Sequence, residues 1–290
     1  MKNVLKRKID LSRFRKFRIF LLNFTAVVIL IYLLLFIFMI IFQDRFLYHP
    51  SNENFYDCDG FENYERKEFN GTRFYYKDLK FSDNVLIYYS GNSGRACDRS
   101  SLTNLYEGYQ ASTIFVEYTG YGGDGNKPSL DLLQQDVLNI VEFTKNYSKV
   151  YVVGESLGTS LASYHSYKTN VDVLLLLAPF YSTQSLGEQM FPFYPISFLA
   201  IENYDSANWI KNYQNRLIII HGIEDKSIPY NQAVDLFYVS NTDDKHLFLL
   251  PNAKHNDLYR YMDTRRIIRY AFLNRTYSNR IEEIRYLSKK

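Results

Sequence analysis

The sequence predicts an α/β fold in which a largely parallel sheet is covered by helices on both faces. Strand-like runs alternate with helical segments, and each run is apolar throughout, as is typical of strands buried on both faces. At the centre, residues 149–163 pass from an apolar β-branched run through a tight turn into helix-compatible residues. A chain of 290 residues can hold one such domain and an appendage. The other predicted strands are 85–89, 112–118, 171–177, 216–221 and 246–250.

The turn at the centre is the pentapeptide Gly154-Glu155-Ser156-Leu157-Gly158. Between a strand and a helix, Gly-x-Ser-x-Gly is the pattern of a nucleophile elbow, which holds its serine in a strained backbone conformation. The two glycines supply the side-chain-free positions that the close approach of strand and helix requires. Three fixed positions in five residues can also arise by chance, but the flanking strand and helix favour the functional interpretation.

The N-terminal region predicts a basic arm followed by a membrane anchor. Residues 1–18 contain eight basic residues and one acidic residue, a net charge of +7, which leaves −4 for the rest of the chain. Residues 19–42 then form an uncharged apolar run that is long enough to cross a bilayer. A buried soluble helix is the alternative, but such helices rarely lack every charge. With the basic arm in the cytoplasm, residues 43–290 are expected on the other side of the membrane.

The segments between the strands carry further signals. Residues 43–66 resemble a connector, and residues 68–75 predict a hairpin that turns at Asn70-Gly71. Residues 90–94 and 119–129 are expected loops, and the first is rich in glycine, so that its backbone could approach a ligand closely. A helix is expected from 130 to about 146. The mildly acidic body excludes a folded basic face for nucleic acid.

Five motifs in order resemble the α/β-hydrolase superfamily, and within it membrane-anchored serine hydrolases with a short cap. The motifs are LIYYSGNSG, VEYTGYGGDGNKPS, VVGESLGTSLA, LIIIHGIEDKSIP and LPNAKHNDL, and the resemblance covers about residues 43–275. Relatives commonly have His-Gly where this chain has Ser90-Gly91. The resemblance implies a serine hydrolase of the esterase or lipase type that needs no cofactor.

The resemblance also implies the order nucleophile, acid, histidine, which Ser156, Asp225 and His255 supply. Glu224 is a rival acid, but the family's acid is followed at this spacing by an aliphatic residue and proline, here Ile228-Pro229. Asp225 could instead be a turn residue ahead of a helix. The remaining histidines are weaker candidates for the base, since they lie next to the membrane, on the helix after the elbow or on strands: His49, His165, His221 and His246.

Each of these residues has a separate chemical role. His255 would take the proton of the Ser156 hydroxyl as general base, and Asp225 would hold the imidazole tautomer. Backbone N–H groups of Leu157 and, by resemblance, Asn92 would hold the oxyanion. Metal sites are disfavoured because the histidines are scattered and Cys58 and Cys97 lie 39 positions apart. The two cysteines could form one disulfide or remain two thiols.

Specificity is expected from the insert at residues 179–215, which contains an aromatic and proline-rich stretch. One interpretation is a cap over an apolar acyl pocket, with Phe191 and Phe198 in contact with substrate. The equal alternative is that these side chains only pack the cap itself. Three classes of function follow: a membrane-anchored hydrolase of lipid or acyl (thio)esters, a peptidase of the same fold, and a binding or scaffold protein with a degenerate site.

Overall fold

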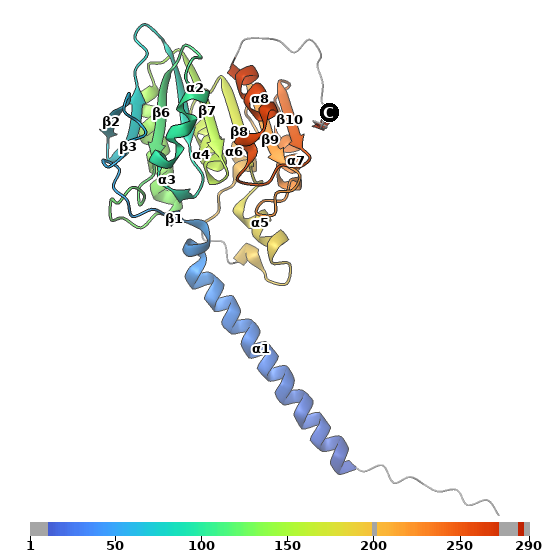
Figure 1. Cartoon of the computed structure of the whole chain (residues 1–290). Coiled ribbons are helices and arrows are strands. Elements are labelled where there is room, and N and C mark those ends of the chain that lie inside the picture. The colour runs from blue at the N-terminus through green and yellow to red at the C-terminus, as the bar shows by residue number, and fades with distance from the viewer. Residues whose placement is uncertain (1–10, 199–201, 273–283, 287–290) are drawn as a thin grey trace, which may run out of the picture. The chain divides into compact units, whose positions relative to one another are not determined.

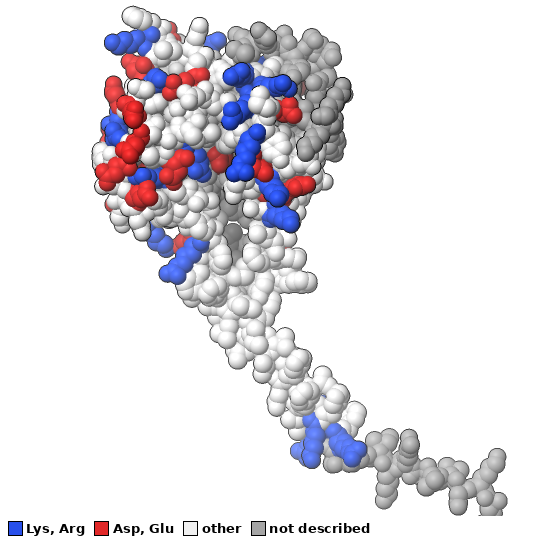
Figure 2. Space-filling model, viewed as in Figure 1, with Lys and Arg blue, Asp and Glu red and all other residues white. Residues whose placement is uncertain are grey.

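The computed structural model describes residues 11–198, 202–272 and 284–286, and divides the chain into two compact units, Met1–Gln43 and Asp44–Lys290. The described part of the first unit is most of helix α1 (Leu11–Leu47). This helix extends beyond the predicted anchor 19–42 at both ends. Within α1, the stretch Arg13–Leu47 has the length and the apolar composition of a helix that could cross a membrane. In Figure 2 the charged side chains of this unit gather near the N-terminal end of the helix, and the middle is uncharged.

The second unit is built on one nine-stranded sheet, and among the described residues its strand order is β11-β10-β9-β8-β7-β4-β6-β3-β2 (Figure 1). The strands from β11 to β6 pair in parallel, whereas β6 with β3 and β3 with β2 are antiparallel. The strands are β2 (Glu65–Phe69), β3 (Thr72–Lys77), β4 (Asn84–Tyr89), β6 (Ser112–Glu117), β7 (Lys149–Glu155), β8 (Val173–Leu177), β9 (Arg216–Gly222), β10 (Lys245–Leu250) and β11 (Ile284–Tyr286). The prediction of a mostly parallel sheet is therefore confirmed.

Helices cover both faces of this sheet because its strands are apolar on both sides. Along β9, Leu217 and Ile219 pack into one buried cluster and Ile218 and Ile220 into the other. The first cluster lies under α3 (Leu130–Thr144), α4 (Leu157–Lys168), α6 (Ser206–Ile210) and α7 (Asn231–Val239). The second lies under η1 (Ala96–Leu102), α2 (Thr103–Tyr106), η3 (Leu258–Arg260) and α8 (Met262–Phe272).

The hairpin between β2 and β3 turns where the sequence predicts it. Asn70 and Gly71 both have positive φ angles, 50° and 88°, as a two-residue hairpin turn requires. On the second face, Cys58 and Cys97 form a disulfide that joins the connector to η1. The connector also contributes β1 (His49–Pro50), which pairs in parallel with β5 (Ser93–Gly94) in the predicted glycine-rich loop.

The insert 179–215 forms two parts with different roles. Its first part contains α5 (Thr183–Met190) and η2 (Ile196–Phe198), and none of the side chains of α5 is fully buried. Its second part contains α6, where Ala207, Trp209 and Ile210 are buried in the cluster that α4 also covers. The second part thus contributes buried side chains to this cluster and α5 contributes none, while the cap role of the insert stays a prediction.

Candidate active site

The elbow at the end of β7 has the backbone geometry that the pentapeptide predicts. Ser156 has a φ angle of 51° and precedes the first residue of α4. A Cβ atom on Gly154 would lie 2.4 Å from the carbonyl oxygen of Gly158. One on Gly158 would lie 2.2 Å from that of Tyr89, so any side chain at either position would collide with backbone. The glycines therefore allow strand and helix to cross closely enough to expose Ser156 at the edge of the sheet.

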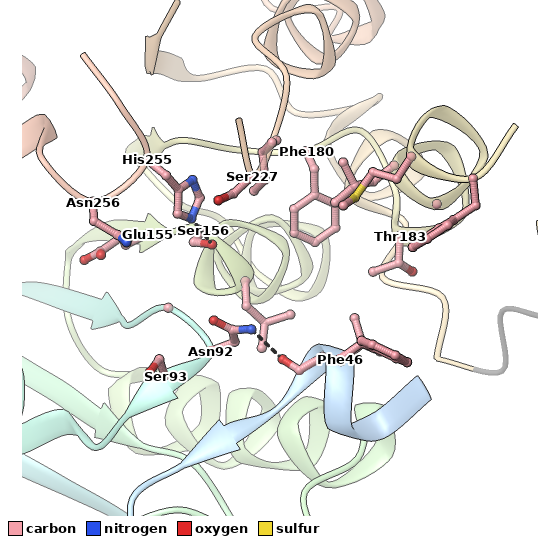
Figure 3. A pocket seen from close by; sticks show the side chains of 18 of the residues that line it. Phe46, Asn92, Ser93, Glu155, Ser156, Phe180, Thr183, Ser227, His255 and Asn256 are labelled. Atoms are coloured by element: carbon pink, nitrogen blue, oxygen red, sulfur yellow. Dashed lines mark hydrogen bonds between the residues drawn. The ribbon is translucent and has the colours of Figure 1, made fainter. Parts of the chain in front are cut away.

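Ser156, His255 and Asp225 form one hydrogen-bonded chain, although 99 and 30 positions separate the neighbouring members in sequence. His255 lies in the loop after β10, and its Nε2 is 2.9 Å from the Ser156 Oγ. Its Nδ1 is 2.6 Å from Oδ2 of Asp225, which follows the end of β9. Because consecutive parallel strands end at the same edge, the loops after β7, β9 and β10 meet there (Figures 1 and 3).

Asp225 is held in a buried network of donors. Its Oδ1 accepts hydrogen bonds from the backbone N–H groups of Ser227 and Ile228, at 2.8 and 2.9 Å. Burial opposes ionisation, but the hydrogen bonds from His221 and His255 and the attraction to His255 outweigh it and lower the pKa of Asp225 well below its usual range. Asp225 is thus an anion throughout the neutral range. The rival acid Glu224 is exposed and does not join this network.

For His221, at a strand position, the sequence favours packing or a satisfied hydrogen bond over the role of base, and the structure places it next to the acid. Its Nε2 donates to the carbonyl oxygen of Ile228 at 2.9 Å and lies 3.4 Å from Oδ2 of Asp225. The other histidines lie elsewhere. His165 is fully buried against the Tyr89 hydroxyl, and burial lowers its pKa to about 3. His246 contacts Asp244, and His49 contacts the side chain of Asn92.

The loop after β4 brings Asn92 to the site. Its carbonyl oxygen accepts from the His49 N–H at 3.0 Å and from the Tyr121 hydroxyl at 2.8 Å, and its side chain donates to the Leu47 carbonyl oxygen at 2.7 Å. The backbone N–H groups of Asn92 and Leu157 have no acceptor among the described residues. Hydrogen bonds with the segment 47–49 thus hold the loop in place. The N–H groups of Asn92 and Leu157 are available to a ligand.

A cavity of about 480 Å³ surrounds Ser156 (Figure 3). Figure 3 shows Phe180 and Phe46 toward one side of the serine, and Ser93 and Asn256 toward the other. The apolar part of its lining consists of Phe46, Leu47, Leu157, Phe180, Leu186, Met190, Phe191 and Ile228. The polar part includes Asn92, Ser93, Arg99, Glu155, Thr183, Ser227 and Asn256.

The two predicted substrate contacts have different outcomes. Phe191 lines the cavity and is 41% exposed. Phe198 ends η2, and its side chain lies outside the described residues. Sequence reasoning missed Phe46, Phe180, Arg99 and Glu155 as lining residues. Glu155 alone carried a signal, because it lies inside the pentapeptide. The described part of the chain holds no group of three or more His, Cys, Asp or Glu side chains suited to a metal ion.

Comparison with known proteins agrees with this architecture. No family model matches the chain. An uncharacterized protein of Mycobacterium tuberculosis is 26% identical over 178 residues, which is 60% of this chain and 63% of that protein. The alpha/beta hydrolase domain-containing protein aho-3 of Caenorhabditis elegans is 24% identical over 191 residues, which is 63% of this chain and 55% of that protein. The chain thus spans less than two thirds of the length of these relatives.

Solved structures define the fold. The crystal structure of MGS-M2, an alpha/beta hydrolase enzyme from a deep-sea metagenome library, matches with a TM-score of 0.59 at 13% sequence identity. The match covers 75% of this chain and 100% of that one. The second unit therefore has the fold of the α/β-hydrolase superfamily, as the five motifs predict.

Proposed function

We propose that this protein is a membrane-anchored serine hydrolase that cleaves carboxylic ester or thioester bonds of acyl or lipid substrates. The observation that carries the proposal is the hydrogen-bonded chain from Ser156 through His255 to Asp225, at 2.9 and 2.6 Å, beside a cavity of substrate size. The distance between the Ser156 Oγ and the His255 Nε2 is short enough for proton transfer from the serine to the histidine.

The reaction proceeds through an acyl-enzyme. As the Ser156 Oγ attacks the carbonyl carbon, His255 Nε2 takes the hydroxyl proton, and Asp225 stabilises the resulting imidazolium. The N–H groups of Leu157 and Asn92 bind the oxyanion. The imidazolium then gives its proton to the departing alcohol or thiol. Water attacks the acyl-enzyme by the same route and releases the acid and the free serine.

The lining of the cavity supports an acyl substrate. Eight apolar residues line the space beside Ser156, and they come from α5, the connector and the core. Burial of an alkyl chain there is favourable by about 0.8 kcal/mol for each methylene group. A peptidase of the same fold remains the alternative reaction, because the same nucleophile and oxyanion site can attack an amide.

A fluorophosphonate probe tests the proposal on the full-length protein in detergent. The wild type is expected to react at one serine, Ser156→Ala to lose both labelling and ester hydrolysis, and Ser166→Ala, a matched change on the same helix, to keep both. Equal labelling of the Ser156→Ala protein would overturn the assignment, and a scaffold protein would not label at all. A decanoyl ester and an aminoacyl anilide, assayed side by side, separate an esterase from a peptidase.

A further inference from the structure

The cavity contains a cation that the proposed reaction does not use. Arg99 lies on η1 and lines the cavity with Ser156. A Cβ atom built on Gly91 would lie 3.9 Å from the Arg99 Nη2 and 3.5 Å from the Ser156 Cβ. Nη2 is therefore no farther from the serine Cβ than the sum of these two distances, about 7.4 Å. A substrate whose carbonyl group is at Ser156 places its neighbouring substituents within reach of this guanidinium.

One edge of the guanidinium is occupied and the other is open. The Arg99 Nε lies 3.5 Å from Oε2 of Glu155, which also accepts a hydrogen bond from the Tyr88 hydroxyl. No hydrogen bond within the described part of the chain involves either Nη atom of Arg99, and the side chain is 23% exposed. The Nη1–Nη2 edge is thus available, and its two parallel N–H groups match two oxygens of one carboxylate or phosphate.

The element that carries Arg99 is firmly held. Cys97, two positions earlier, is bonded to Cys58. The Ala96 N–H donates to the buried carboxyl group of Glu117 at 3.1 Å, and the Arg95 side chain contacts the backbone of Asn54 and the carboxylate of Asp98. A guanidinium on such a fixed element loses little freedom when it binds, which favours recognition of a ligand group.

Arg99 also remains charged in this setting. Burial disfavours the cation, but Glu155 stabilises it and raises the pKa of Arg99 above its ordinary value. Among the lining residues in the described part of the chain, Arg99 is the one arginine or lysine, and Glu155 is the one aspartate or glutamate. The described lining of the cavity is therefore apolar along α5 and the connector, and the guanidinium group of Arg99 lies on the side of η1.

We propose that Arg99 binds an anionic oxygen group, a phosphate or a carboxylate, on the alcohol portion of the ester. The inference rests on the proposed function and specifies its substrate: an acyl ester with an apolar acyl chain and an anionic alcohol portion. The acyl chain occupies the apolar lining, so the alcohol portion extends toward η1. Glu155 contacts the Nε edge of the guanidinium group, and the anionic group of the substrate binds to the Nη1–Nη2 edge.

Matched esters test this specificity. The substrates are monodecanoylglycerol, decanoylglycerol phosphate and the decanoyl ester of hydroxypropanoate, which share an acyl chain and differ in the charge of the alcohol portion. The measured quantity is the ratio of kcat/KM for each anionic ester to that for the neutral one. We expect Arg99→Gln to lower the ratio at least tenfold for both anionic esters, and Arg99→Lys, which keeps the charge but not the fork, to lower it less. If only the phosphate ratio falls, the ligand is a phosphate.

The control is Arg216→Gln, which removes an arginine paired with Asp244 at the start of β9. Its ratio is expected to equal that of the wild type. An unchanged ratio in Arg99→Gln, or an equal fall in Arg216→Gln, would overturn the proposal.

A second measurement has a decisive comparison on the wild-type protein, which does not depend on the folding of any variant. Glycerol phosphate is expected to slow fluorophosphonate labelling of the wild type, whereas glycerol at the same concentration is not, and Arg99→Lys is expected to weaken this protection. Equal effects of glycerol and glycerol phosphate on the wild type would refute the role of Arg99. Labelling at Ser156 and turnover of the neutral ester would still support the hydrolase itself, so the two proposals fail separately.

Discussion

The Nε2 atom of His221 lies 3.4 Å from Oδ2 of Asp225, the same oxygen that the His255 Nδ1 contacts at 2.6 Å. Both His221 and the Asp225 side chain are fully buried. His221 also donates to the Ile228 carbonyl, and the Ile228 N–H donates to Asp225, so the three residues fix one another. We infer from these contacts that His221 positions the carboxylate of the proposed triad.

Replacement of His221 should slow the reaction without weakening substrate binding. A hydrogen bond to a charged group contributes about 1.5–3 kcal/mol, so we expect His221→Ala to lower kcat by about tenfold or more. KM should stay near the wild-type value, and His221→Gln, which retains a donor, should recover part of the rate. A change confined to KM, or equal losses in the two variants, would contradict a positioning role.

The identity of the acid can be tested with two neighbouring residues. Asp225→Asn should lower kcat by roughly ten-thousandfold, because the amide favours the wrong tautomer of His255. Glu224→Gln changes the adjacent, exposed carboxylate and should stay within about twofold of the wild type. Steady-state ester hydrolysis by both variants measures this difference. A crippled Glu224→Gln enzyme beside a nearly normal Asp225→Asn enzyme would mean that Glu224 is the acid.

The apolar lining predicts a preference for long acyl chains. Each buried methylene contributes about 0.8 kcal/mol, which is about a fourfold increase in kcat/KM, so decanoyl esters should exceed acetyl esters by a wide margin. Phe191→Ala should reduce this preference. Phe193→Ala is the matched control, since Phe193 is 86% exposed and does not line the cavity in the described part of the chain. Faster turnover of acetyl esters would contradict the acyl pocket.

Glu117 predicts a loss of stability as the pH rises. Burial raises the pKa of this carboxyl group from 4.5 to about 8. Between these two pH values the folded state keeps the proton and the unfolded state releases it, so the free energy of unfolding falls with increasing pH. Glu117→Gln, which resembles the protonated form, should show a weaker dependence. Thermal unfolding at several pH values checks this.

Glu142→Gln on the exposed face of α3 is the control for that measurement and should follow the wild type. Parallel curves for the wild type and Glu117→Gln would mean that Glu117 is ionised in the folded protein at neutral pH.

The side of the membrane on which the second unit lies is a further prediction. The basic residues before the apolar run should stay in the cytoplasm, and a disulfide between Cys58 and Cys97 is typical of the opposite compartment. On intact cells, an impermeant maleimide should label the protein only after an impermeant reductant has been added. The Cys58→Ser, Cys97→Ser double variant provides the background. Labelling after lysis without any reductant would place the unit in the cytoplasm.

The sequence by itself determined the parts of this protein whose signals are local. Gly154, Ser156 and Gly158 specify the elbow because a short spacing and two absent side chains are enough to define it. Asn70-Gly71 specifies its hairpin in the same way, through two positive φ angles. The apolar strands specify a buried parallel sheet, and an uncharged run of membrane length specifies the long helix.

Only the tertiary structure decided which distant residues meet. His221 carries no sequence signal that separates a packing role from contact with Asp225, because the distinction depends on how the β9 loop folds back. Arg99 lines the cavity because of the position of η1, which the Cys58–Cys97 disulfide joins to the connector. Phe46 lines the cavity from the connector. These contacts join segments that are far apart in the chain. A local sequence pattern predicts the backbone conformation of the residues that form it. The neighbours of a residue in space depend instead on how the helices and loops pack around the whole sheet.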